Sequence, residues 1–282
     1  MTTETEPEVK PRNLRLIFAA LMVTMLLAAL DQTIVSTALP TITSDLGGLN
    51  ELSWVVTAYL LASTASTPIW GKLSDLYGRK PMLQTAVAIF VVTSALAGLS
   101  QNMSQLIATR ALQGIGGGGL MVLVMAVIAD LVSARERGRY SGLFGAVFGI
   151  SFIVGPALGG FLTDQVSWHW VFYVNLPIGL ISLYVIWHLL PTMRAKNASR
   201  NLDYLGALVF TIAIGLLLVG LTNKQTADWT DFSVGGLIIA GLVGTLLFIL
   251  IESRAPEAIV PLDLWRNRTY VASMLATFAV SF

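Results

Sequence analysis

Eight apolar runs, most of them close to the length of a membrane-spanning helix, dominate this sequence. They cover residues 14–39, 52–70, 81–100, 103–132, 140–162, 170–190, 204–221 and 232–251, and a ninth run begins at residue 269. An α-helix needs about 20 apolar residues to cross a bilayer core about 30 Å thick. Hydrophobic residues occupy 55 % of the 282 positions and charged residues only 12 %. The pattern predicts an all-α integral membrane protein.

Lysine and arginine residues are concentrated in every second connection between the runs. This distribution predicts how the chain is oriented in the membrane. Only Lys224 falls in the opposite set of connections, and Arg110 lies inside a run. Basic residues mark cytoplasmic loops, so the N-terminus is predicted to be cytoplasmic and the protein to be a multi-pass protein of the cell membrane. The remaining fifteen are Lys10, Arg12, Arg15, Lys72, Arg79, Lys80, Arg135, Arg137, Arg139, Arg194, Lys196, Arg200, Arg254, Arg266 and Arg268.

Several function classes find no support in the composition. The net charge is +1 without a basic patch, so no nucleic-acid partner is expected. Cysteine is absent, and the two histidines, His169 and His188, lie far apart, so we expect no metal site. No nucleophile with a base and no phosphate-binding loop is found, so we expect neither an enzyme nor an ATP-driven protein. The run at 14–39 is too long for a signal peptide and is expected to remain as the first span.

Two charged residues lie deep within the apolar runs, away from the ends of the runs. Asp31 interrupts the first run and Arg110 the fourth. Both are expected about 20 Å from the cytoplasmic edge, at similar depth. An ionisable residue inside a membrane is by default a candidate functional residue, here either a static ion pair or a pair that takes up and releases a proton as helices move. Gln113 is a further polar candidate beside Arg110.

The stretch GKLSDLYGRKPML, residues 71–83, predicts a charged cytoplasmic turn of about ten residues between the second and third spans. Gly71 and Gly78 are expected to give backbone freedom at its two ends, and Pro81 to start the next helix. Asp75, Arg79 and Lys80 place charge at the membrane surface. An ordinary basic loop remains the simpler interpretation.

Glycines gather in two later spans. Gly114 and Gly118 have the GxxxG spacing that lets helices approach closely. Gly114, Gly116 and Gly119 match the GxGxxG pattern of a dinucleotide site, but that site requires a preceding strand and none is predicted. In the fifth span, Pro156 is expected to kink the helix, while Gly155, Gly159 and Gly160 are expected to leave one side nearly smooth, for sliding or for tight packing. At the start of the sixth span, the predicted outer aromatic belt consists of Trp168, Trp170, Phe172 and Tyr173.

These segments together resemble the major facilitator superfamily. GKLSDLYGRK, RALQGIGGGG and GPALGG are similar to its loop, fourth-span and antiporter signatures, while LDQTIVSTALP and WHWVFYVNLPIG resemble its fourteen-span drug:proton antiporters. The resemblance implies proton coupling through Asp31 and Arg110, with Asp31 and Gln113 as tentative contacts of the substrate cavity. It also implies a cytoplasmic gate and an antiporter motif. The gate consists of Gly71, Asp75, Gly78, Arg79, Lys80 and Asp130, and the motif of Gly155, Pro156, Gly159 and Gly160.

The expected organisation follows from the resemblance. Residues 1–13 form a cytoplasmic N-terminus, 14–190 a six-span N-terminal bundle, 191–203 a cytoplasmic loop, 204–251 two extra linking spans, 252–268 a second cytoplasmic loop and 269–282 the start of a C-terminal bundle. Transport by alternating access needs two bundles. We therefore expect the C-terminal half to follow in the same chain, and a natural truncation is the alternative.

The expected function is proton-driven export of amphipathic drugs or other toxic small molecules across the cytoplasmic membrane, with no cofactor. Small molecules, protons and the lipid bilayer are the expected partners. Two alternatives remain open: export of a specific metabolite, siderophore or lipid by the same fold, and a truncated half-transporter that transports nothing.

Overall fold

A computed structural model describes residues 14–192, 203–255, 259 and 262–280, and within these ranges every regular element is a helix. The predicted segment 1–13, most of 191–203 and parts of 252–268 lie outside the described residues. The chain divides into two compact units, Met1–Ala198 and Ser199–Phe282.

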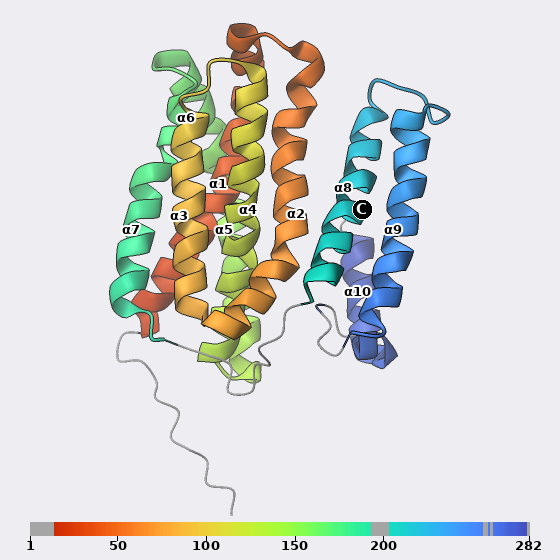
Figure 1. Ribbon diagram of the computed structural model, residues 1–282. Helices are drawn as coiled ribbons and strands as arrows, with labels where there is room; N and C mark the ends of the chain where they lie inside the picture. Colours follow the sequence, from red (N-terminus) through yellow and green to blue (C-terminus); the bar gives the residue numbers. More distant parts are fainter. Residues whose placement is uncertain (1–13, 193–202, 256–258, 260–261, 281–282) are drawn as a thin grey trace, which may run out of the picture. The chain divides into compact units, whose positions relative to one another are not determined.

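The first unit is a bundle of long helices that lie side by side (Figure 1). Its elements are α1 (Leu14–Leu46), η1 (Leu49–Glu51), α2 (Leu52–Tyr77), α3 (Arg79–Ala97), α4 (Met103–Leu131), α5 (Ala134–Gln165), α6 (Trp170–Tyr173) and α7 (Asn175–Leu189). Helix α4 packs against α1, α2 and α3, while α1 packs against α5 and α7. Two clusters of buried apolar side chains form its core.

The second unit contains α8 (Tyr204–Asn223), η2 (Phe232–Gly236), α9 (Leu237–Glu252), η3 (Leu262–Arg266) and α10 (Arg268–Val280). Helices α8 and α9 pack against each other along a seam of small residues. A Cβ atom added to Gly241 would lie 2.6 Å from Leu217 Cγ, and one added to Gly244 would lie 2.9 Å from Ala213 Cβ. This unit corresponds in sequence to the two predicted linking spans and the beginning of the ninth.

Seven helical segments of the described residues are long and apolar enough to cross a membrane, and they match seven of the eight predicted spans. The exception is the predicted span 52–70, which forms most of α2. Residues such as Ser63, Thr64 and Thr67 make α2 less apolar than its neighbours. Some of this polarity is satisfied inside the bundle, because Ser66 Oγ and Trp70 Nε1 donate hydrogen bonds to the carbonyl oxygen of Ile115 in α4, at 3.3 and 2.7 Å.

The connection between α2 and α3 is much shorter than predicted. Helix α2 continues through Gly71 and ends at Tyr77, so Gly78 alone separates it from α3. Gly78 has φ 102° and ψ 151°, a backbone conformation that side chains with a Cβ rarely adopt. The expected flexible role of Gly71 is therefore wrong, whereas Pro81 does lie in the first turn of α3. The predicted loop is a sharp helical corner.

Glycines on α4 bring two neighbouring helices close to its backbone. A Cβ atom on Gly114 or Gly118 would collide with the carbonyl oxygens of Tyr59 and Ser63 in α2, and one on Gly116 would lie 2.7 Å from the backbone nitrogen of Phe90 in α3. The GxxxG spacing therefore does mark a close helix contact, as predicted.

The glycines of α5 divide into two groups. Gly155 faces Thr33 of α1, and a Cβ atom on Gly159 would lie 3.0 Å from the carbonyl oxygen of Ile34. Gly160 has open space around it, so the expectation that all three form one packing side is wrong. Pro156 lies inside α5, which continues as a single helix to Gln165.

The sixth predicted span consists of α6 and α7, which are separated by a single turn residue, Val174, whose backbone angles stay in the right-handed helical region (φ −59°, ψ −25°). Its aromatic residues do not form a belt on the surface. Trp168 and Phe172 are buried in the core, and Trp168 Nε1 donates a hydrogen bond to Asp45 Oδ2 at 2.7 Å, whereas Trp170 is exposed. The belt expectation is wrong for Trp168 and Phe172, because both rings are buried in an apolar cluster with residues of α1.

Candidate functional site

A buried ion pair links α1 and α4 in the interior of the first unit. Arg110 Nη1 lies 2.6 Å from Asp31 Oδ2, and the two side chains are 1 % and 0 % exposed. Asp31 lies in the middle of α1 and Arg110 eight residues into α4, so the similar depth expected from sequence is observed as direct contact. Isolated charges in such a place would cost several kilocalories per mole, which the pairing offsets.

Gln113 closes a triangle with this ion pair. Arg110 Nη1 donates to Gln113 Oε1 at 2.7 Å, and Gln113 Nε2 donates to Asp31 Oδ1 at 2.9 Å. Arg110 and Gln113 are three residues apart and therefore lie on the same face of α4. The amide uses its acceptor for the cation and a donor for the anion, which fits the needs of both charges.

The sixth span contributes a third donor to the carboxylate. Asn175 Nδ2 donates to Asp31 Oδ1 at 2.7 Å and to Ser94 Oγ in α3 at 3.0 Å. Ser94 Oγ in turn donates to the carbonyl oxygen of Phe172 at 2.9 Å. The carboxylate of Asp31 thus accepts hydrogen bonds from Arg110, Gln113 and Asn175. Charge-assisted hydrogen bonds of this kind are about twice as strong as neutral ones.

Helix α2 surrounds the other side of Arg110. The guanidinium lies 4.4 Å from the centroid of the Tyr59 ring, and Arg110 Nε donates to the carbonyl oxygen of Val55 at 3.4 Å. The site therefore joins α1, α2, α4 and α7 directly, and α3 through Ser94. The three donors that bond to the Asp31 carboxylate come from α4 and α7 and converge on one buried side chain.

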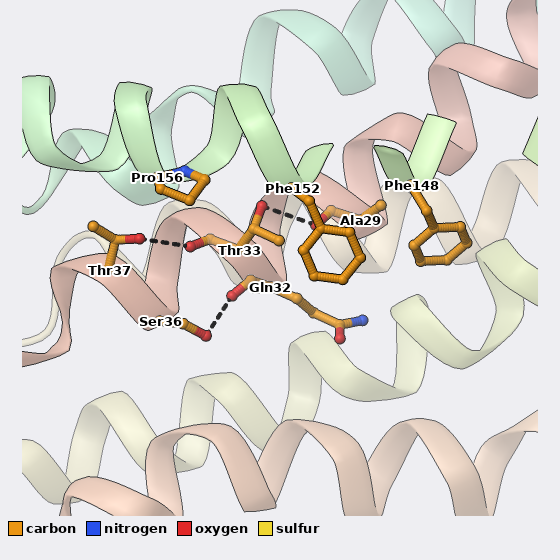
Figure 2. Close-up of a pocket in the computed structure, with 8 residues that line it drawn as sticks. All are labelled: Ala29, Gln32, Thr33, Ser36, Thr37, Phe148, Phe152 and Pro156. Carbon is orange, nitrogen blue, oxygen red and sulfur yellow. Dashed lines mark hydrogen bonds between the residues drawn. The ribbon is translucent and has the colours of Figure 1, made fainter. Parts of the chain in front are cut away.

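A groove of about 390 Å³ runs between α1 and α5 (Figure 2). It is amphipathic, because α5 contributes two phenylalanine rings and a proline while α1 contributes an amide and three hydroxyls. Those hydroxyls are bonded to backbone carbonyls, for example Ser36 Oγ to Gln32 O at 2.7 Å and Thr37 Oγ1 to Thr33 O at 3.0 Å. The lining residues are Ala29, Gln32, Thr33, Ser36, Thr37, Phe148, Phe152 and Pro156.

The predicted cavity residues Asp31 and Gln113 do not line this groove. Both are 0 % exposed and point into the bundle, where they bond to each other and to Arg110. Asp31 follows Leu30 and precedes Gln32 in the chain, so the groove and the ion pair use different sides of the same stretch of α1. Of the residues predicted to form an antiporter motif, Pro156 lines the groove, and Gly155 and Gly159 lie close to Thr33 and Ile34 of α1.

The predicted gate residues gather where α2, α3 and α4 end or begin. Arg79 Nη1 lies 2.7 Å from Asp75 Oδ1, and Arg79 Nε lies 2.9 Å from Asp130 Oδ2. We call Asp75, Arg79 and Asp130 the corner charge cluster, because Gly78 forms the corner beside it. Arg79 also bonds to Ser74 Oγ. Lys80 is directed elsewhere, and its Nζ donates to the carbonyl oxygen of Trp187 near the end of α7 at 2.7 Å.

Within the described parts of the chain, no group of three or more histidine, cysteine, aspartate or glutamate residues is placed to hold a metal ion. Sequence reasoning found Asp31, Arg110 and Gln113 but missed Ser94, Tyr59 and the contact of Asn175 with Asp31. Serine and tyrosine are ordinary residues of membrane helices. The sequence signal that could have identified Asn175 is an amide inside the sixth predicted span, two positions before Pro177.

Comparison with known proteins gives consistent similarities. A profile described as Major Facilitator Superfamily matches residues 21–203. The chain is 41 % identical over 97 % of its length to the multidrug transporter protein MdtP of Bacillus subtilis, and 38 % identical over 95 % to multidrug resistance protein 3 of the same organism. It spans 51 % and 52 % of these relatives, about half of each.

Among solved structures, the human organic anion transporter MFSD10 (TETRAN) matches with a TM-score of 0.58. The match covers 99 % of this chain and 67 % of that one, at 20 % sequence identity, and it supports a common fold.

Proposed function

Because the chain belongs to the Major Facilitator Superfamily and is a multi-pass membrane protein, we propose that it forms the N-terminal half of a proton-coupled exporter of amphipathic small molecules. Relatives whose names describe multidrug transport and resistance support this class of cargo. The homologous C-terminal half completes the substrate pathway in the same chain. The exporter lies in the cell membrane with its N-terminus in the cytoplasm, as the distribution of basic residues favours.

The proposal of proton coupling rests on one observation, the buried carboxylate of Asp31. It lies inside a membrane-spanning helix and has three donors from two other helices. In the proposed cycle, Asp31 accepts one proton from the outer side and later releases that proton to the cytoplasm, while substrate moves outward. The driving force is the proton gradient, so no cofactor takes part. The corner charge cluster holds the cytoplasmic side closed while the outer side is open.

The first prediction tests this role of Asp31. Asp31→Asn keeps the size of the side chain and its acceptor oxygen but removes the group that exchanges a proton. We expect it to abolish proton-coupled dye efflux in the complete transporter, compared with wild type at matched abundance in the membrane. Dye efflux measured in energised vesicles at several proton gradients checks this. Gradient-dependent efflux at the wild-type rate would exclude Asp31 as the coupling residue.

The groove between α1 and α5 is the proposed contact surface for substrate. None of its lining side chains is charged, and its aromatic residues suit flat apolar ring systems. Phe152→Ala should therefore weaken efflux of aromatic dyes several-fold, chiefly through a higher KM, and leave small aliphatic substrates less affected. Phe161→Ala is the matched control, because Phe161 is an exposed phenylalanine on the same helix that does not line the groove. Equal losses in both variants would contradict this assignment.

A further inference from the structure

Asn175 lies directly after Val174, the single turn residue between α6 and α7 in the sixth span. It is the first residue of α7, it is 0 % exposed, and the preceding helix α6 ends two positions earlier at Tyr173. Its amide nitrogen donates to Asp31, and Ser94 joins it to the carbonyl oxygen of Phe172 on α6. The amide of Asn175 therefore bonds directly to the Asp31 carboxylate. Through Ser94 it is also connected to Phe172, on the other side of Val174.

The other end of this amide has no partner. Among the described residues, Asn175 Oδ1 is a buried oxygen atom without a hydrogen bond. A buried polar atom without a partner destabilises the folded state, so its presence calls for a physical reason. A side-chain amide turned through half a circle would present this oxygen to Asp31 and accept a hydrogen bond from a protonated carboxyl group. That turn would also withdraw the nitrogen from Ser94.

Helix α7 extends from this point to a contact with Lys80, the residue that follows Arg79 in the chain. Its fifteen residues, Asn175–Leu189, span about 22 Å. Near its far end, the carbonyl oxygen of Trp187 accepts the hydrogen bond from Lys80. Lys80 follows Arg79, which binds Asp75 and Asp130. One helix therefore contacts the candidate proton site at its first residue and the candidate gate close to its last.

We infer that Asn175 is a positioning residue that responds to the charge of Asp31 and transmits the change through α7 to Lys80, next in the chain to the corner charge cluster. With Asp31 charged, the amide donates to the carboxylate and to Ser94, and the junction of α6 and α7 is held closed. With Asp31 neutral, the amide loses its charged acceptor, the junction loosens and the end of α7 shifts against Lys80. This inference rests on the proposed function for its purpose, but the coupling itself is a structural property of the chain.

Hydrogen–deuterium exchange followed by mass spectrometry tests the coupling without any transport step. The protein in lipid nanodiscs is compared as wild type, Asp31→Asn, Asn175→Leu and the double variant. We expect each single variant to raise amide exchange several-fold in the junction, residues 170–176, and to a smaller extent at the end of α7, residues 186–190. The double variant should show no further increase, since both changes break the same connection.

Two further variants protect the test against misfolding of Asn175→Leu. Ser94→Ala removes one partner of Asn175 and should raise exchange at the junction alone. Thr93→Val is its control, because Thr93 Oγ1 bonds to carbonyl oxygens of its own helix, Ile89 at 2.6 Å and Phe90 at 3.2 Å. It should leave the junction unchanged.

Three results would overturn the inference: unchanged exchange at the junction in Asp31→Asn, additive increases in the double variant, or equal effects of Ser94→Ala and Thr93→Val. Failure of the proposed function is a different result. If Asp31→Asn loosens the junction as expected but still supports gradient-dependent efflux, the coupling stands and the proton role of Asp31 does not.

Discussion

At the scale of single residues, Asp31 and Arg110 illustrate how two charges are kept inside an apolar bundle. The Arg110 guanidinium contacts a carboxylate, an amide oxygen, a backbone carbonyl and an aromatic ring. Removal of one partner from such a buried pair leaves the other without compensation, which is costly, whereas removal of both is much less so. The pair therefore makes a quantitative prediction about stability.

Arg110→Met should destabilise the first unit by about 3–5 kcal/mol, because it leaves the buried Asp31 carboxylate with two neutral donors only. Asp31→Asn should cost less, since an asparagine oxygen still accepts from Arg110. The double variant Asp31→Asn with Arg110→Met should recover most of the loss. Thermal unfolding in detergent, followed by circular dichroism, measures the series.

Arg254→Met serves as the control for this series, because Arg254 is exposed at the end of α9 and its loss should leave the unfolding temperature nearly unchanged. Independent, additive effects of the Asp31 and Arg110 substitutions would contradict the account of the pair given above.

At the scale of helices, some glycines lie against a neighbouring helix and others face open space. Comparing the two kinds distinguishes a role in helix packing from a role in backbone flexibility. Gly118→Ala should cost about 1–3 kcal/mol, because the new methyl group would meet the backbone of α2 at Ser63. Gly145→Ala in α5 has open space around it and should be neutral or stabilise by up to about 1 kcal/mol. Unfolding temperatures of the two variants check the difference, and a similar loss in both would mean that glycine acts here through backbone flexibility.

The sequence was sufficient to predict the helical spans and the contact of Asp31 with Arg110, because apolar length and rare intramembrane charges are strong signals. It was insufficient for features that depend on tertiary contacts. The bond from Asn175 to Asp31 requires α1 and α7 to be adjacent. The turn at Val174 before Asn175 is likewise not visible in the length of the apolar run. The prediction of a loop at residues 71–83 was wrong for a related reason. Polar residues such as Ser74 form hydrogen bonds within the helix and the bundle, so α2 extends to Tyr77.

At the scale of the whole molecule, the alternation of basic residues predicts which connections share a side of the membrane. Single cysteines can be introduced into this chain, which contains none. Tyr77→Cys should react with a membrane-impermeant maleimide only in inside-out vesicles, and Gln101→Cys and Gln225→Cys only in right-side-out vesicles. All three native side chains are exposed, so access from either side depends on orientation alone. Labelling of Tyr77→Cys and Gln101→Cys from the same side would refute the predicted orientation.

The corner at Gly78 also bears on how this protein can be engineered. An epitope tag, a fluorescent protein or a protease site is usually inserted into the most charged stretch between two spans. By sequence alone, residues 71–83 would be selected for such an insertion. With one residue between α2 and α3, any insertion there would push apart the helix ends that bring Asp75, Arg79 and Asp130 together. The turn at residues 224–231, between α8 and η2, offers a safer position for a reporter.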